Sequence, residues 1–214
     1  MDSTSTISRT RNTRRGQSHR DRPGDDRVVM IDIDGVLADL SPHDEVLRDA
    51  DIPAVQRWRE FFAHIPDAAV IEAGHDLASA IESLGYTLVY STTRPAYTRA
   101  ATRLWLADRD FPAGRALLTR PTTEFAQHPQ TAWRIKRAHT RAVTNRQPAW
   151  LRAFIDDDAD DLARLASEGI PVHDAAALRT LGVSALRTHL DHPKTTTTGG
   201  PAEHTTTGRS RRTR

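Results

Sequence analysis

Short apolar runs alternate with amphipathic stretches along the central part of the chain. The apolar runs are bounded by turn-forming residues, which is typical of strands buried in the middle of a sheet. We expect strands at residues 28–31, 86–91, 116–119, 151–155 and 170–173. Apolar residues recur with helical spacing at residues 72–84, 96–108, 131–144 and 159–168. Strands that alternate with helices predict an α/β fold, namely a Rossmann-like parallel sheet with helices on both faces.

The segment at residues 40–70 interrupts this alternation. It carries Trp58, Phe61 and Phe62 at roughly helical spacing, and prolines punctuate it. The segment is too long for a plain loop and too short for a separate domain. We therefore expect a small helical cap insert over the strand ends, in which the three aromatic residues pack rather than bind substrate.

Composition divides the 214 residues into a body and two tails. Residues 1–27 carry seven Arg and four Asp, and residues 190–214 are rich in Thr, Gly and basic residues. Neither tail can bury enough apolar surface to fold, so we expect both to be disordered. Residues 28–189 are slightly acidic and suit one domain. Solubilising tails are the simpler interpretation, because aromatic residues are not interleaved with the basic ones; weak contact with nucleic-acid phosphates is the alternative.

The absence of Cys excludes a disulfide framework, a thiol nucleophile and a thiolate metal site. Any metal must therefore be held by oxygen or imidazole ligands. No apolar run approaches the ~20 residues of a membrane span. Arg14-Arg15 is not followed by an apolar core, so no secretory signal is predicted. We expect a cytoplasmic protein without a membrane partner.

The first predicted strand leads into the most informative stretch, Asp32-Ile33-Asp34-Gly35. Residues two apart in an extended chain point the same way, so both carboxylates should lie at the ligand-binding edge of the sheet. Like charges this close require a cation or a proton between them. Gly35 allows an abrupt turn whose backbone approaches a bound group. For this stretch alone, a solvated turn is the alternative interpretation.

The second predicted strand ends in Ser91-Thr92-Thr93-Arg94. Hydroxyl groups and a guanidinium at a strand end suit a phosphoryl group, because both donate hydrogen bonds to its oxygens. Capping of the following helix by Thr92 or Thr93 is the alternative.

A lysine and a run of aspartates add two further candidates. Only Lys136 and Lys194 are lysines among 30 basic residues, so position 136 is expected to need a compact ammonium group unless it is an ordinary surface lysine. Asp156-Asp157 ends the fourth predicted strand and supplies candidate metal ligands. Asp160 and Asp161 fall in the first turn of the next helix, and we expect them to cap it.

Together, Asp32-Ile33-Asp34-Gly35, Thr92 with Arg94, Lys136 and Asp156-Asp157 resemble the haloacid dehalogenase-like hydrolase superfamily, whose members are mostly phosphatases. The resemblance covers residues 28 to about 180. Further stretches resemble the phosphatase domain of bifunctional polynucleotide kinases and its stand-alone relatives: Trp58-Arg59-Glu60-Phe61-Phe62, Thr92-Thr93-Arg94, Trp105-Leu106 and Leu118-Thr119-Arg120.

The resemblance implies a Mg²⁺-dependent phosphomonoester hydrolase that acts through an aspartyl-phosphate. Asp32 would be the nucleophile, and Asp34 the general acid and then the general base. Thr92 and Lys136 would hold the phosphoryl oxygens. The implied substrate-binding residues are Gly35, Thr93 and Arg94. The implied Mg²⁺ ligands are the carboxylates of Asp32 and Asp156, the backbone carbonyl of Asp34, and Asp157, which would bind through water or instead orient Lys136.

The second carboxylate distinguishes phosphatases from dehalogenases of the same superfamily. A halide leaves without a proton whereas an alkoxide needs one, so Asp34 favours phosphoryl transfer. The subgroup suggests a polynucleotide 3′-phosphate as substrate, and a nucleotide or another small phosphomonoester fits nearly as well. The alternative function is a non-catalytic Mg²⁺- and phosphate-binding protein that docks on nucleic acid or a protein partner through its basic tails.

Overall fold

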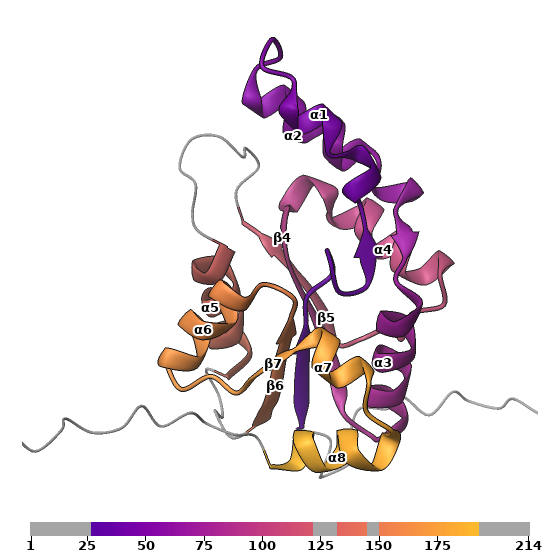
Figure 1. The fold of residues 1–214 in the computed structure, drawn as a ribbon, viewed down its shortest axis with the longest axis vertical. Helices are drawn as coiled ribbons and strands as arrows, with labels where there is room; N and C mark the ends of the chain where they lie inside the picture. Colours follow the sequence, from indigo (N-terminus) through magenta and orange to yellow (C-terminus); the bar gives the residue numbers. More distant parts are fainter. Residues whose placement is uncertain (1–26, 122–131, 145–149, 193–214) are drawn as a thin grey trace, which may run out of the picture.

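A computed structural model describes residues 27–121, 132–144 and 150–192 (Figure 1). Residues 1–26 and 193–214, the bulk of the two predicted tails, lie outside the described residues. The described chain is built on a five-stranded sheet in the order β5-β4-β1-β6-β7, in which every strand pairing is parallel. Its strands are β1 (Val28–Ile31), β4 (Thr87–Pro95), β5 (Ala116–Arg120), β6 (Leu151–Asp156) and β7 (Val172–Asp174).

Side chains of β1 alternate between two hydrophobic cores. Val29 and Ile31 face one core and Val28 and Met30 the other, and none of the four is exposed. Helices cover both faces of the sheet, as predicted (Figure 1). One face is covered by α3 (Glu72–Ser83), α4 (Arg99–Asp108), α7 (Ala175–Arg179) and α8 (Val183–Asp191), and the other by α5 (Ala132–Thr144) and α6 (Ala159–Ser167).

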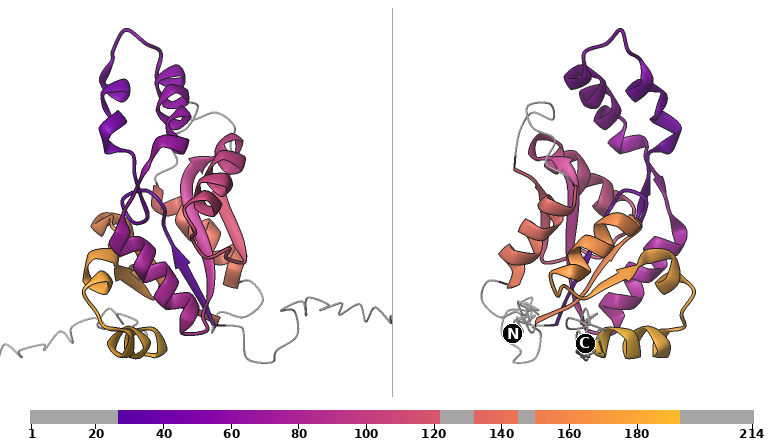
Figure 2. Two further views of the ribbon diagram at one scale, coloured as in Figure 1. Left: turned by 90° about the vertical axis from the view of Figure 1, so that its right-hand side faces the viewer. Right: turned by 60° about the vertical axis from the view of Figure 1, so that its left-hand side comes forward.

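A helical insert leaves the sheet a few residues after β1. It is framed by β2 (Ala38–Asp39) and β3 (Ala69–Val70), which pair antiparallel. Figures 1 and 2 show its two helices projecting beyond the sheet. Because it follows the end of β1, the insert lies at the carboxyl edge of the sheet. Its elements are η1 (Ser41–His43), α1 (Glu45–Arg48), α2 (Ala54–Ala63) and η2 (Ile65–Asp67).

Aromatic packing and one long-range hydrogen bond fix the base of the insert. Phe61 and Phe62 are buried, and the Trp58 ring lies 5.6 Å from each of their rings, so the three aromatic residues pack against one another. The Trp105 indole N–H of α4 donates a 3.0 Å hydrogen bond to the Ala68 carbonyl. Helix α4 therefore supports the root of the insert next to the strand ends.

Two helices near the end of the described chain were not predicted from the sequence. They are α7 and α8, which bury Leu178, Leu186 and Leu190 in the first core. The Asp191 carboxylate at the end of α8 accepts a 2.5 Å hydrogen bond from the Tyr86 hydroxyl. Within the described ranges, no helix combines the length and the apolar character needed to cross a membrane.

Candidate active site

Three strands deliver polar side chains to one place at the carboxyl edge of the sheet. Asp32 follows β1 directly, Thr92 and Arg94 belong to the end of β4, and Asp156 is the last residue of β6. Strand β1 lies between β4 and β6, so the chain crosses over to opposite sides of it. Parallel sheets bind ligands at such a switch point, because the two crossovers diverge there and leave a crevice.

Lys136 of α5 occupies the middle of a carboxylate cluster. Its Nζ atom lies 3.1 Å from Asp32 Oδ2, 2.6 Å from Asp156 Oδ2 and 3.2 Å from Asp161 Oδ2. Burial by itself would lower the pKa of Lys136, but the surrounding carboxylates outweigh it and raise this pKa above its ordinary value. Lys136 is therefore a buried, charged ammonium and not a surface lysine.

Asp161 corrects the sequence prediction for the start of α6. The helix is capped by Asp158, whose Oδ1 accepts hydrogen bonds from the backbone N–H groups of Asp160 (2.9 Å) and Asp161 (3.0 Å). The Asp161 side chain is buried and pairs with Lys136 instead. Asp161 lies four residues before buried Leu165, and this helical spacing is the signal that could have placed it on the inner face.

Asp32, Asp156 and Asp157 form a candidate metal centre. One carboxylate oxygen from each lies within 4.8 Å of the others. Asp32 Oδ1 is buried and has no hydrogen-bond partner among the described residues, since Lys136 contacts only Oδ2. Burial raises the pKa of Asp32 well above its ordinary value, and Lys136 opposes that rise. A hard cation such as Mg²⁺ fits this centre, because it prefers oxygen ligands and would neutralise the excess negative charge.

Arg94 holds the carboxylate of Asp34. Its Nε lies 3.0 Å from Asp34 Oδ2 and its Nη2 lies 2.7 Å from Asp34 Oδ1, while Nη1 donates to Thr102 Oγ1 at 3.2 Å. The Arg94 side chain is fully buried. The sequence predicts that this guanidinium binds substrate; in the structure each of its three nitrogens donates to Asp34 or Thr102. Arg94 therefore fixes the orientation of Asp34.

Thr92 and Thr93 differ in their contacts with this pair. Thr92 is buried, and its hydroxyl lies 3.5 Å from Asp34 Oδ2 and accepts the Arg94 backbone N–H at 3.1 Å. Thr93 is half-buried and makes no side-chain hydrogen bond to the described residues. The structure thus brings Thr92 to the carboxylates and leaves Thr93 at the edge of the site.

Gly35 shapes the turn after the two aspartates. Its φ of +74° is one that glycine adopts readily, and a Cβ there would lie 2.0 Å from Asp157 Oδ2. The Gly35 N–H donates to the Ala38 carbonyl at 2.9 Å, so this group is engaged within the turn. Arg179 of α7, which the sequence did not single out, donates to the Gly35 carbonyl at 3.1 Å. The absence of a side chain at Gly35 therefore allows the Asp157 carboxylate to lie close to the backbone of this turn.

His139 anchors α5 beneath the carboxylate cluster. Its Nδ1 lies 2.9 Å from Ser91 Oγ, and its Nε2 lies 3.3 Å from the Thr119 carbonyl oxygen. A carbonyl only accepts, so Nε2 carries the proton and Nδ1 accepts from the serine hydroxyl. Burial lowers the pKa of His139 to about 4. This neutral imidazole ties the helix that carries Lys136 to β4 and β5.

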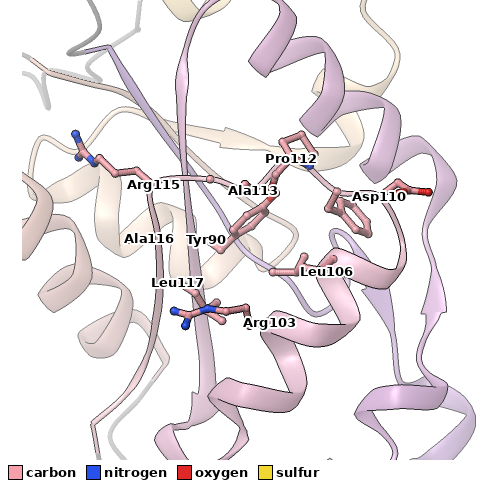
Figure 3. A pocket seen from close by; sticks show the side chains of 12 residues that line it. Tyr90, Arg103, Leu106, Asp110, Pro112, Ala113, Arg115, Ala116 and Leu117 are labelled. Atoms are coloured by element: carbon pink, nitrogen blue, oxygen red, sulfur yellow. The ribbon is translucent and has the colours of Figure 1, made fainter. Parts of the chain in front are cut away.

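A cavity of about 590 Å³, shown in Figure 3, is lined by none of the residues of this cluster. It is formed by α4, the loop after it and β5, and its lining includes Tyr90, Leu106 and Leu117. Its one acidic residue, Asp110, points away from the cavity in Figure 3. The Tyr90 hydroxyl is already bonded to the Pro112 carbonyl at 2.5 Å. The cavity lacks the paired carboxylates that lie at the strand ends. We therefore place the candidate active site at the strand ends and not in this cavity.

No protein-family model and no curated protein matches this sequence. Solved structures do match. The chain is similar to the structure titled Pnkp1/Rnl/Hen1 complex, with a TM-score of 0.51 and 16% identity over 72% of this chain and 47% of that one. It is also similar to a predicted phosphatase from Clostridium acetobutylicum, with a TM-score of 0.50 and 13% identity over 68% and 82% of the two chains. This chain therefore spans less than half of the first match, and at these identities the likeness concerns the fold.

Proposed function

We propose that this protein, whose fold is that of the haloacid dehalogenase-like phosphatases, hydrolyses phosphomonoesters through an aspartyl-phosphate on Asp32. The observation that carries the proposal is the pair formed by Asp32 and Asp34. Asp32 is buried and keeps Oδ1 without a hydrogen-bond partner among the described residues, whereas Asp34 is more exposed and held by Arg94. Two carboxylates in such different environments suit a nucleophile and a proton carrier.

Asp32, Asp156 and Asp157 would hold Mg²⁺, together with the backbone carbonyl of Asp34. Bound there, Mg²⁺ would shield the carboxylates from one another and neutralise charge on the phosphoryl oxygens. The buried oxygen of Asp32 and the mutual approach of the three carboxylates support this ligand set.

Asp32 performs the first chemical step. Its carboxylate oxygen bonds to phosphorus as the bond from phosphorus to the leaving alkoxide breaks, and Asp34 gives that alkoxide its proton. Asp34 then takes a proton from the water that attacks the aspartyl-phosphate, which releases inorganic phosphate and restores Asp32. Lys136 and Thr92 hold the phosphoryl oxygens while charge is redistributed.

Arg94 acts through Asp34 and is a positioning residue. Its two-pronged contact fixes the plane of the Asp34 carboxylate, and Thr102 fixes the guanidinium in turn. Asp34 donates a proton in the first step and accepts one in the second, so its carboxylate must keep the same position in both. The buried Arg94 provides that rigidity, because its two-pronged contact holds the carboxylate in one plane.

We further propose a polynucleotide 3′-phosphate as the substrate, with a nucleotide as the second candidate. The sequence motifs shared with polynucleotide kinase phosphatase domains support this choice. The similarity of fold to the Pnkp1/Rnl/Hen1 structure agrees with it.

The test is hydrolysis of p-nitrophenyl phosphate by purified protein. The Asp32→Asn variant is expected to lose more than ~10³-fold in kcat with its fold intact, because an amide cannot replace the nucleophile. Asp160→Asn is the matched control, since Asp160 is an exposed aspartate of α6 outside the cluster. EDTA should abolish turnover, and added Mg²⁺ should restore it. Substantial turnover by Asp32→Asn would refute the nucleophile, and a wild-type protein that binds Mg²⁺ and phosphate without turnover would favour the non-catalytic alternative.

A further inference from the structure

We infer that Tyr97 and Arg59 form a recognition site for the terminal base and the adjoining phosphodiester of a polynucleotide substrate. The inference rests on the proposed function, because it names the substrate class of that same site. Its starting observation is an exposed tyrosine in the segment that directly follows Arg94, the residue that holds Asp34.

Tyr97 is the middle residue of η3 (Ala96–Thr98), three residues beyond Arg94. Tyr97 is 44% exposed, although its neighbours Pro95 and Thr98 are buried and joined by a 2.8 Å hydrogen bond from Thr98 Oγ1 to the Pro95 carbonyl. The segment is therefore firmly held while the ring meets solvent. A rigid, accessible ring is the requirement for stacking a base at low entropic cost.

The hydroxyl of Tyr97 also sets it apart from the other tyrosines. Tyr86 and Tyr90 are buried and donate to Asp191 and Pro112. The Tyr97 hydroxyl has no hydrogen-bond partner among the described residues. Protein packing thus accounts for the first two rings and leaves the third available to a ligand.

Arg59 is the charged group of the insert whose field acts on Tyr97. It is an exposed residue of α2, and η2, which follows that helix, packs against α4 directly beyond η3. Partial burial raises the pKa of Tyr97, and the Arg59 charge opposes that rise, so the guanidinium lies within electrostatic reach of the ring. The described residues supply no carboxylate to Arg59.

The wall formed by α4 continues this positive charge. Arg99 is bound to Thr119 Oγ1 at 2.7 Å at the end of β5, and Arg103 is exposed one turn further along α4. The catalytic carboxylates lie instead around β1 and β6. A polyanion would therefore extend from the carboxylate centre toward Tyr97, Arg59 and α4. An aliphatic phosphomonoester has neither a ring to stack nor a second phosphate to bind, so it would use none of these groups.

The experiment compares kcat/KM for three substrates: a 3′-phosphorylated oligonucleotide, the same oligonucleotide with an abasic 3′-terminal residue, and glycerol 2-phosphate. Tyr97→Ala should lower the value about tenfold for the first, which corresponds to one lost base–ring stack of ~1.4 kcal/mol. It should leave the other two unchanged, and Tyr97→Phe should behave like wild type. Leu104→Ala is the matched control, because Leu104 is 61% exposed on α4.

Arg59→Gln tests the phosphate contact. It should lower kcat/KM for both oligonucleotides and not for glycerol 2-phosphate, and the loss should shrink at high salt because it is electrostatic. Arg48→Gln is the control, since Arg48 is an exposed arginine of the same insert.

The failure of this inference can be told from that of the proposed function. Equal losses on all three substrates would show a structural role and overturn the inference, and so would unchanged oligonucleotide turnover in both variants. Hydrolysis of glycerol 2-phosphate without hydrolysis of the oligonucleotides would overturn the inference and leave the phosphatase intact. Absence of turnover on every substrate would refute both.

Discussion

Replacing Lys136 by Met tests whether the buried carboxylates depend on this ammonium group to neutralise their mutual repulsion. Methionine has a similar length and no charge, so the change removes the ammonium while nearly preserving volume. Lys136 is only 3% exposed and contacts Asp32, Asp156 and Asp161, all of which are buried. Removing one partner of a buried ion pair lowers stability by about 3–5 kcal/mol, because the other charge stays buried without compensation. With three carboxylates affected, we expect a loss in that range at about pH 8 in chelator.

The pH dependence of this loss has a definite sign. Burial raises the pKa values of Asp32, Asp156 and Asp161. An acid with a raised folded pKa destabilises the protein above that pKa, and the effect disappears as the pH falls toward its unfolded value of about 3.9. The deficit of Lys136→Met should therefore shrink progressively as the pH falls from about 8 toward 3.9.

Urea unfolding followed by circular dichroism measures both effects. Adding Asp161→Asn to Lys136→Met should recover part of the stability, because one uncompensated carboxylate is removed. Mg²⁺ should stabilise the variant more than wild type if the cation enters the same cluster. A variant within about 0.5 kcal/mol of wild type at about pH 8 in chelator would contradict the cluster described above.

Two further predictions concern the residues that support the site. The pKa of His139 is lowered to about 4 in the folded protein, so the unfolded protein binds a proton at this residue first as the pH falls. Wild-type stability should therefore drop by up to about 3 kcal/mol between about pH 6.5 and 4. His139→Gln should flatten that part of the stability curve in chemical denaturation, and an unchanged slope would contradict the assignment. Arg94→Lys should lower kcat about tenfold or more with little change in KM, because a single ammonium cannot reproduce the two-pronged contact with Asp34. A rise in KM at constant kcat would return Arg94 to substrate binding.

The spacing of residues along the chain was enough to predict the sheet. The strands of the sheet and their helices appear as local patterns of apolar residues, and β1 alternates between two cores as a buried strand should. Helices α7 and α8 were missed, because their few buried leucines, such as Leu178 and Leu186, give too weak a periodic signal. Their burial depends on the sheet against which they pack.

The site was only partly accessible to the same reasoning. The sequence singled out Asp32, Lys136 and Asp156, and the structure brings these three together. It did not find that Asp161 pairs with Lys136, or that Arg94 is committed to a carboxylate 60 residues away. Sequence spacing does not record which donors are already used, so Arg94 could only be judged by its chemistry.

The sequence by itself determined the α/β alternation and the presence of carboxylates, hydroxyls and one lysine at strand ends, because burial and turn formation depend on a few neighbouring residues. Only the tertiary structure decided which of these groups meet and what each one contacts. Pairing of β1 with both β4 and β6 places their ends together, and the packing of α5 and α6 then encloses one ammonium among three carboxylates. These contacts join residues far apart in the chain, so their energies are set by the assembled fold.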